Sequence, residues 1–219
     1  MCDRSKRDDM SIISPTFIRP NLNNKSDVIE LFEEMKQIYN YYKVSSKSVE
    51  IIEGKNIGCL GLIRSYTDFS ALGFVLTKLR ENKRFRELNL KILEKQFGDT
   101  TTNGQIWLTI FGSRNWNANP VSMVRQYSVS RDQLPSMLSI LSEIQNIMDK
   151  KKVNVLGLIP PLGEGLSALH VPYQFESLDH WGEVLDYIKN SEDMKSLIGQ
   201  KSKFGSLETG HLMIPLNKI

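Results

Sequence analysis

Hydrophobic residues follow two spacings along the chain, and the spacings occur in the same order in each half. Apolar residues recur every three to four positions over about 27–42, 68–95, 132–150 and 177–188, which predicts four amphipathic helices. Alternating or continuous apolar runs predict strands over about 13–19, 48–53, 57–66, 105–111, 121–128, 153–159, 166–175 and 211–216. The segment from Gly98 to Gly104 is expected to be a loop. Each half therefore reads strand, helix, strand, strand, helix, strand.

The two halves also align residue by residue. With an offset of 109 residues, Phe69–Leu88 aligns with Leu178–Leu197, and Gly73 falls on Gly182. A duplicated unit restricts the fold strongly, and this order of elements is the ferredoxin-like plan. The predicted fold class is α+β, with two ferredoxin-like βαββαβ repeats forming an intrachain α+β barrel. We expect a flexible leader over 1–12, a first repeat over 13–113 and a second over 119–219.

Composition narrows the class of protein. The 219 residues are 40% hydrophobic and 24% charged, as in soluble globular proteins, and the net charge of +3 does not indicate nucleic acid as a partner. No apolar run is long enough to span a membrane, and the charged N-terminus does not resemble a secretory signal. The only two cysteines, Cys2 and Cys59, have no metal-ligand spacing, so we expect no metal site and a cytoplasmic protein. Met10 is a second candidate for the start of the chain.

Three segments carry a resemblance to a known superfamily: the strand-to-helix patterns Leu62–Phe69 and Val171–Trp181, and the closing segment Phe204–Leu216. With them the chain resembles the dimeric α+β barrel superfamily, with the usual homodimer fused into one chain. The stretch Gly104–Asn115, followed by Val124–Ser130, is similar to NIPSNAP-type domains.

The resemblance implies several functions, and fold alone does not choose between them. The superfamily includes haem enzymes similar to chlorite dismutase, cofactor-free monooxygenases, and small binding or cyclising proteins. The chlorite-dismutase-like enzymes carry their haem-ligating histidine on the first helix of the second half. The corresponding helix here, about 132–150, contains no histidine, which counts against haem catalysis of that type.

All three histidines lie in the second half. His170 is in an apolar strand and is a candidate base, a candidate metal or haem ligand, or a hydrogen-bonded core residue. His180 is expected to serve the start of its helix. His211 begins the last predicted strand and is the candidate cofactor ligand. If strand pairing brings it near His170, the two could share a site.

Strand alternation gives a second set of candidates. Arg125 and Tyr127 share one face of their strand, as do Arg64 and Tyr66 in the first half. An arginine beside a tyrosine on an apolar face can bind an acidic or carbonyl-bearing ligand, because both donate hydrogen bonds. Alternatively, these residues lie at strand ends with their polar groups in water. The list of substrate-binding candidates is completed by Tyr173 and by Trp116, which is either a pocket lid, a contact surface or part of the barrel rim.

These observations predict a small-molecule-binding protein with its pocket in the second repeat. If it is an enzyme, we expect a cofactor-free monooxygenase or a proton-transfer enzyme, with His170 as base or ligand and with Arg125 and Tyr127 orienting a polar group. One alternative is a non-catalytic NIPSNAP-like interaction protein, and another is a haem-binding barrel that uses His170 or His211. Oligomers would form through barrel or sheet edges. The sequence leaves open whether the protein is an enzyme and which ligand it binds.

Overall fold

The computed structural model describes residues 11–102, 105–113, 119–161 and 167–216. The chain divides into two compact units. Unit 1 comprises residues 1–108 and 215–219, and unit 2 comprises residues 109–214.

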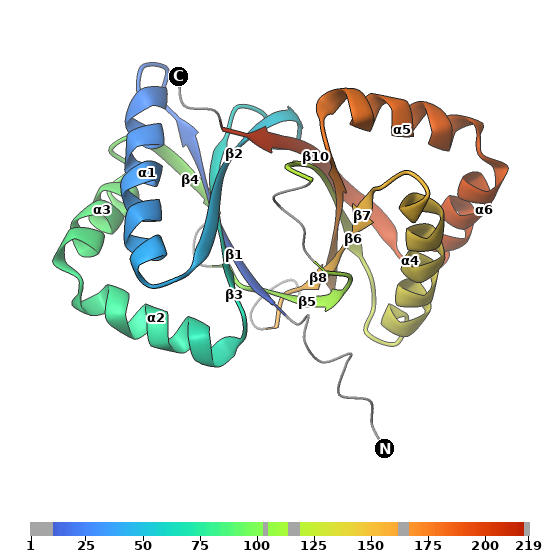
Figure 1. Ribbon diagram of the computed structural model, residues 1–219, viewed down its shortest axis with the longest axis horizontal. Coiled ribbons are helices and arrows are strands. Elements are labelled where there is room, and N and C mark those ends of the chain that lie inside the picture. The colour runs from blue at the N-terminus through green and yellow to red at the C-terminus, as the bar shows by residue number, and fades with distance from the viewer. Residues whose placement is uncertain (1–10, 103–104, 114–118, 162–166, 217–219) are drawn as a thin grey trace. The chain divides into compact units, whose positions relative to one another are not determined.

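Unit 1 is an antiparallel sheet covered on one face by helices (Figure 1). Its strands lie in the order β4–β1–β3–β2, and the start of β5 also pairs with β1. Buried apolar residues of α1, α2 and α3 pack on the sheet and form one core. The elements are β1 (Ile12–Pro20), α1 (Lys25–Tyr41), β2 (Ser45–Gly54), β3 (Leu60–Tyr66), α2 (Phe69–Glu81), α3 (Lys83–Leu93), β4 (Gly98–Thr102) and β5 (Trp107–Phe111).

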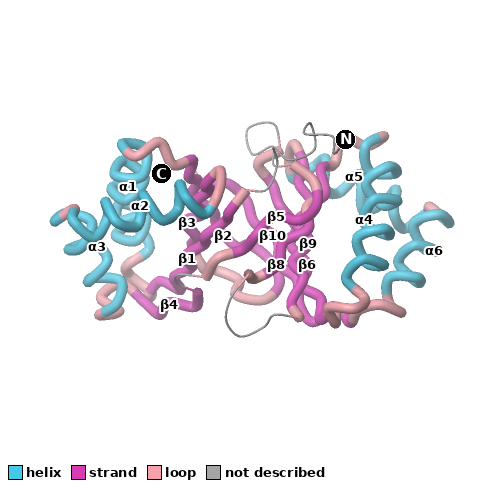
Figure 2. Tube along the Cα trace, turned by 90° about the horizontal axis from the view of Figure 1, so that it is seen from below, coloured by secondary structure: helices cyan, strands magenta, loops and turns pink. Residues whose placement is uncertain are grey.

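Unit 2 repeats this plan. Its antiparallel strands lie in the order β10–β6–β9, with the short strands β7 and β8 on the other edge of β9. Figure 2 shows α4, α5 and α6 together on one side of these strands. The elements are β6 (Val121–Ser128), α4 (Leu134–Asp149), β7 (Asn154–Val155), β8 (Gly157–Ile159), β9 (Ala168–Phe175), α5 (Leu178–Asn190), α6 (Glu192–Lys201) and β10 (Ser206–Pro215).

The offset of 109 residues found in the sequence also relates the elements of the two units. Ile12 lies opposite Tyr66 in unit 1, and Val121 lies opposite Phe175 in unit 2. The buried stripe of α1 has its counterpart in α4, 109 residues later: Val28, Leu31, Phe32, Met35 and Tyr39 correspond to Met137, Ile140, Leu141, Ile144 and Met148. The buried faces of the two units therefore follow one pattern of positions.

The predicted fold class, α+β with two ferredoxin-like units, is confirmed. The closing of their sheets into one barrel stays a prediction. Three local predictions are wrong. The helix expected over 68–95 is two helices, because Asn82 has an extended backbone and its side chain accepts from the Phe85 amide, which begins α3. The expected loop after Gly98 is strand β4, since it pairs with β1, and the last strand begins at Ser206. The expected leader ends earlier, because Ile12 is in β1 and 1% exposed.

Candidate functional site

Arg125, Tyr127 and Tyr173 form a polar cluster inside unit 2. Arg125 and Tyr127 lie two residues apart on β6, and Tyr173 is on the neighbouring strand β9. The Arg125 guanidinium carbon is 5.8 Å from the centre of the Tyr173 ring, which is a cation–π distance. Arg125 is partly buried, whereas the two tyrosines are buried. The cluster therefore combines a guanidinium with two phenol groups in apolar surroundings.

Burial keeps both phenols of this cluster protonated. It raises the pKa of Tyr127, although the charge of Arg125 and a hydrogen bond from Arg125 act in the opposite direction. The pKa of Tyr173 is raised by burial first and by Tyr127 second, and Arg125 again lowers it. Two protonated phenols and a guanidinium can donate hydrogen bonds to one oxygen atom that carries negative charge.

His170 lies on the other face of the same sheet. In β9 it is directly opposite Gln126, whereas Arg125 is opposite Val171, and directly opposite residues share a face. The Arg125 face is the one covered by α5, because Phe175, two residues from Tyr173 on β9, makes an edge contact with His180 of that helix. The structure therefore brings Arg125, Tyr127 and Tyr173 together and does not place His170 with them.

His211 shares its face with His170. It is opposite Val124 on β6, two residues from Gln126, so the two histidines lie on β10 and β9 with β6 between them. Burial lowers the pKa of His170 to about 4, and the nearby charge of His211 lowers it further. At neutral pH His170 is a neutral imidazole.

His180 serves the start of α5, as the sequence predicts. Its backbone amide donates to the Ser177 hydroxyl (3.0 Å), which caps the helix. Its ring accepts from the Glu176 amide at Nδ1 (3.1 Å), and its Nε2 lies 2.8 Å from the Lys151 carbonyl oxygen. These contacts fit the tautomer with its proton on Nε2 and hold the helix against the loop after α4.

Arg64 is the centre of a second polar cluster, inside unit 1. Its Nε donates to the Ser14 carbonyl oxygen (2.8 Å), and its Nη2 donates to the hydroxyls of Thr16 (2.8 Å) and Ser14 (3.2 Å). Its Nη1 donates to the Tyr39 hydroxyl (3.0 Å), which projects from α1. Arg64 is only 6% exposed, so the alternative of a strand-end arginine with its head in water is wrong.

The ring of Tyr66 lies near this cluster. Burial raises its pKa, and so does Tyr39, whereas Arg64 lowers it. Tyr66 is 5% exposed, so its phenol is not in water either. Among the residues that the structure describes, no carboxylate pairs with Arg64, and neutral oxygens satisfy its donors. Such a saturated guanidinium holds β1, β3 and α1 together rather than presenting free donors to a ligand.

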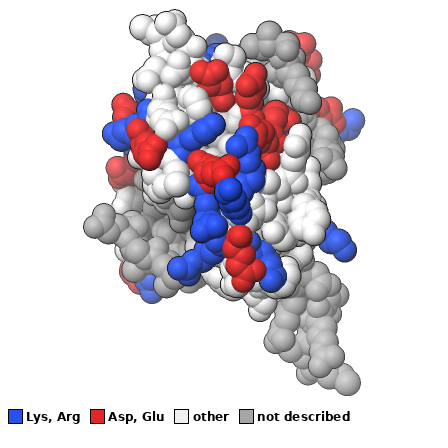
Figure 3. Space-filling model, turned by 90° about the vertical axis from the view of Figure 1, so that its left-hand side faces the viewer, with Lys and Arg blue, Asp and Glu red and all other residues white. Residues whose placement is uncertain are grey.

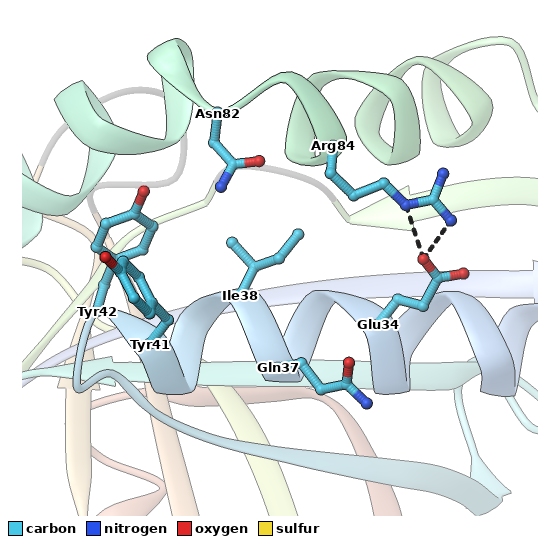
Figure 4. A pocket seen from close by; sticks show the side chains of 7 residues that line it. All are labelled: Glu34, Gln37, Ile38, Tyr41, Tyr42, Asn82 and Arg84. Carbon is cyan, nitrogen blue, oxygen red and sulfur yellow. Dashed lines mark hydrogen bonds and ion pairs between the residues drawn. The ribbon is translucent and has the colours of Figure 1, made fainter.

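A surface groove of about 650 Å³ runs between the end of α1 and the junction of α2 and α3. Figure 4 shows Arg84 directed at Glu34, Tyr41 and Tyr42 side by side at the other end, and Ile38 between them. Arg84 also pairs with Glu87, so its charge is already neutralised. Figure 3, a view of this helix-covered side, shows basic side chains interspersed with acidic ones. The groove has no concentration of one charge that would select an ionic ligand.

Other candidates find less support. Trp116 lies outside the described residues. No described group of three or more His, Cys, Asp and Glu side chains could hold a metal ion. On the helix-covered side of unit 2, α4 has no histidine and His180 is engaged at the start of α5, so histidine does not fit as a haem ligand there. No helix in the described part of the chain has the length and apolar character needed to cross a membrane.

By sequence, no protein family and no curated protein matches this chain. Solved structures do match it. An anthrone oxidase-like protein has a TM-score of 0.62 at 13% identity, covering 96% of this chain and 93% of that one. A protein from Lactobacillus acidophilus, proposed to be a monooxygenase, has a TM-score of 0.62 at 9% identity, covering 96% and 99%. A chlorite dismutase variant from Candidatus Nitrospira defluvii has a TM-score of 0.52 at 10% identity, covering 94% and 92%.

What these proteins share is the fold. The chain therefore has the α+β fold found in monooxygenase-like and chlorite-dismutase-like proteins, as the resemblance in the sequence implied. Identities this low do not carry over a reaction or a ligand.

Sequence reasoning missed three partners of Arg64. Tyr39 was counted in the apolar stripe of its helix, and Ser14 and Thr16 belong to a strand that Pro15 made hard to recognise. The available signal was the alternation of Ser14 and Thr16 on one strand face. That signal was too weak to use, because the partner strand and the register were unknown.

Proposed function

We propose that this protein binds a small molecule with a carbonyl, enolate or phenolate oxygen at Arg125, Tyr127 and Tyr173. The observation that carries this is the contact of a partly buried guanidinium with two buried, protonated phenols under the helices of unit 2. Arg64 has the same residue types near it, but its donors are occupied by its own unit. Unit 2 is therefore the better site, in agreement with the pocket expected from the sequence.

The same cluster suits oxidation or proton transfer on an activated substrate. Donors placed in advance around an oxygen stabilise the negative charge that develops when a neighbouring carbon loses a proton. The carbanion formed can then react with dioxygen without a cofactor. Similarity in fold to an anthrone oxidase-like protein and to proteins proposed to be monooxygenases supports this class of reaction. His170 lies on the other sheet face, so the proposal does not use it as the base.

Replacing Arg125 tests the site. Anthrone is a suitable probe because it enolises next to its carbonyl. We expect saturable binding to the purified protein, and we expect Arg125→Gln to weaken it by about tenfold to a hundredfold, the loss of one charged hydrogen bond. Calorimetric titration gives the dissociation constants, and oxygen uptake reports oxidation. Arg131→Gln removes the same charge from an exposed turn and is the matched control. Equal binding by Arg125→Gln and the unaltered protein would rule out this site.

The proposal includes action in the cytoplasm. Cys59 is a free, buried thiol, and burial raises its pKa, so it stays protonated and unreactive. A protein without a disulfide in its described part suits a reducing compartment.

A non-catalytic NIPSNAP-like interaction protein is the second candidate function. Descent of the two units from one duplicated ancestor belongs to the same proposal, and the shared offset of 109 residues supports it. The observation that favours an interaction role is a strongly apolar exposed face on α2, where Phe69, Phe74 and Leu76 are 46–61% exposed. The two functions use different units and are compatible.

Haem binding through His170 or His211 is tested by titration with haemin. A neutral imidazole is the form that ligates iron, and the two histidines share one sheet face. A sharp Soret band that saturates and is lost in His170→Ala or His211→Ala is the expected sign of a haem protein. A broad signal that both variants leave unchanged would remove haem from the candidate functions.

A further inference from the structure

Helix α2 exposes an apolar surface that its own unit leaves uncovered. Phe69 is 48% exposed, Phe74 61% and Leu76 46%. No charged residue occurs between Phe69 and Thr77, and the remaining exposed positions of this stretch are Ser70, Gly73 and Thr77. At helical spacing the three small residues form a line, with Phe69 and Leu76 on one side of it and Phe74 on the other. In Figure 1, α2 is the helix at the lower left.

The fold itself does not require this surface. Helix α5 occupies the equivalent place in unit 2, has the same length and begins with the same kind of cap, in which a side chain at the N-cap accepts from the amide three residues on. At three exposed positions, α5 has carboxylates where α2 has uncharged residues. The pairs are Ser70 and Asp179, Phe74 and Glu183, and Thr77 and Asp186. Because α5 shows the same helix adapted to water, the surface of α2 indicates contact with another apolar surface.

We propose that α2 is a homodimer interface, in which two copies of the chain pack their α2 helices antiparallel across a two-fold axis near Gly73. This differs from the barrel or sheet edges expected from the sequence. An isologous contact needs a surface that is complementary to itself. The uncharged stretch meets its own copy without repulsion, and the small residues let the two helix backbones approach while the phenylalanines pack on the partner helix.

Charge at the two ends of α2 fits the same arrangement. Asp68 is at the N-cap, and Arg80 is in the last turn. In an antiparallel pair each Arg80 lies beside the Asp68 of the partner subunit, so each helix contributes one ion pair. Among the described residues Arg80 has no ion-pair partner, and Asp68 uses one carboxylate oxygen, Oδ1, to cap Ala71 (2.7 Å). The opposed helix dipoles also favour this direction.

The size of the interface sets its strength. A helix of 13 residues is about 20 Å long, so the contact is smaller than the roughly 800 Å² per partner of a stable complex. The dimer is therefore weak and concentration-dependent.

Sedimentation velocity on the full chain tests the interface. From about 1 to about 200 μM, a range chosen for a micromolar dissociation constant, we expect a shift from monomer to dimer. Phe74→Asp is expected to weaken the dimer at least tenfold and leave the circular dichroism spectrum unchanged, because Phe74 is exposed. Glu183→Ala, at the equivalent place on α5, is the matched control and should dimerise like the unaltered chain. A chain that is monomeric throughout, or a dimer that Phe74→Asp does not weaken, overturns the proposal.

Disulfide trapping distinguishes α2 from other contacts. Gly73 and Gly182 are equivalent helix positions, and at both a Cβ atom would have nothing within 4 Å. In a Cys2→Ser background, Gly73→Cys is expected to form a covalent dimer on mild oxidation, since it lies at the two-fold axis. Gly182→Cys is expected to stay monomeric. Equal trapping of both variants also overturns the proposal.

Discussion

Arg64→Ala is expected to lower the free energy of unfolding by about 4 kcal/mol. The substitution removes donors from the Ser14 carbonyl and from the hydroxyls of Ser14, Thr16 and Tyr39, and it opens a cavity between β3 and α1. Each buried acceptor that loses its donor costs about 1–3 kcal/mol, and partial relaxation keeps the total below the sum. Urea unfolding followed by circular dichroism measures the change.

Three further substitutions show whether the hydrogen bonds or the charge matter. Tyr39→Phe removes one of the bonds and should cost about 1 kcal/mol. Arg64→Lys should fall between the two, because an ammonium group cannot reproduce the fork that reaches β1 and α1 at the same time. Arg86→Ala, on the exposed side of α3, should change stability by less than about 0.5 kcal/mol. If Arg64→Ala is no worse than Arg86→Ala, the cluster is not structural.

The stability of the protein is expected to fall by about 3 kcal/mol as pH drops from about 6.5 to about 4, because of His170. Above the ordinary histidine pKa of 6.5 the imidazole is neutral in both folded and unfolded chains, so it makes no difference to stability. Below 6.5 the unfolded chain binds a proton and the folded chain does not. The unfolded state is then favoured progressively until the pH reaches the folded pKa, about 4.

Urea unfolding at a series of pH values between 4 and 7.5 measures this slope. His170→Gln keeps a polar side chain opposite Gln126 and cannot take up the proton, so its slope in this window should be much smaller. His180→Gln provides the comparison, because His180 lies at a helix start rather than in the sheet. The pKa assigned to His170 is contradicted if the His170→Gln variant and the unaltered protein lose stability in parallel. Exposed carboxylates with lowered pKa values, such as Asp99 and Asp132, titrate below this window.

Local pattern was sufficient for the plan of the fold. The apolar stripe of α1 and the alternation in β3 are short-range properties, so the chain shows them without any partner. The repeat was also readable, because an offset of 109 residues preserves the buried positions of α2 and α5 even where the residues differ. The break at Asn82 was missed because a single cap residue interrupts an otherwise continuous periodicity.

The composition of the candidate site depended on the tertiary structure. Sequence alternation placed Arg125 and Tyr127 on one face, since both belong to one strand. The register between β6 and β9 then decided that Tyr173 joins them and His170 does not, and a shift of one residue would have reversed this. The burial of Arg64 was likewise decided by Tyr39 on α1 and by β1, which are distant in the chain. The sequence by itself therefore determined the elements, their order and their repetition, because these depend on near neighbours. Only the tertiary structure decided which polar groups meet, because strand register and helix packing bring together residues that no local pattern links.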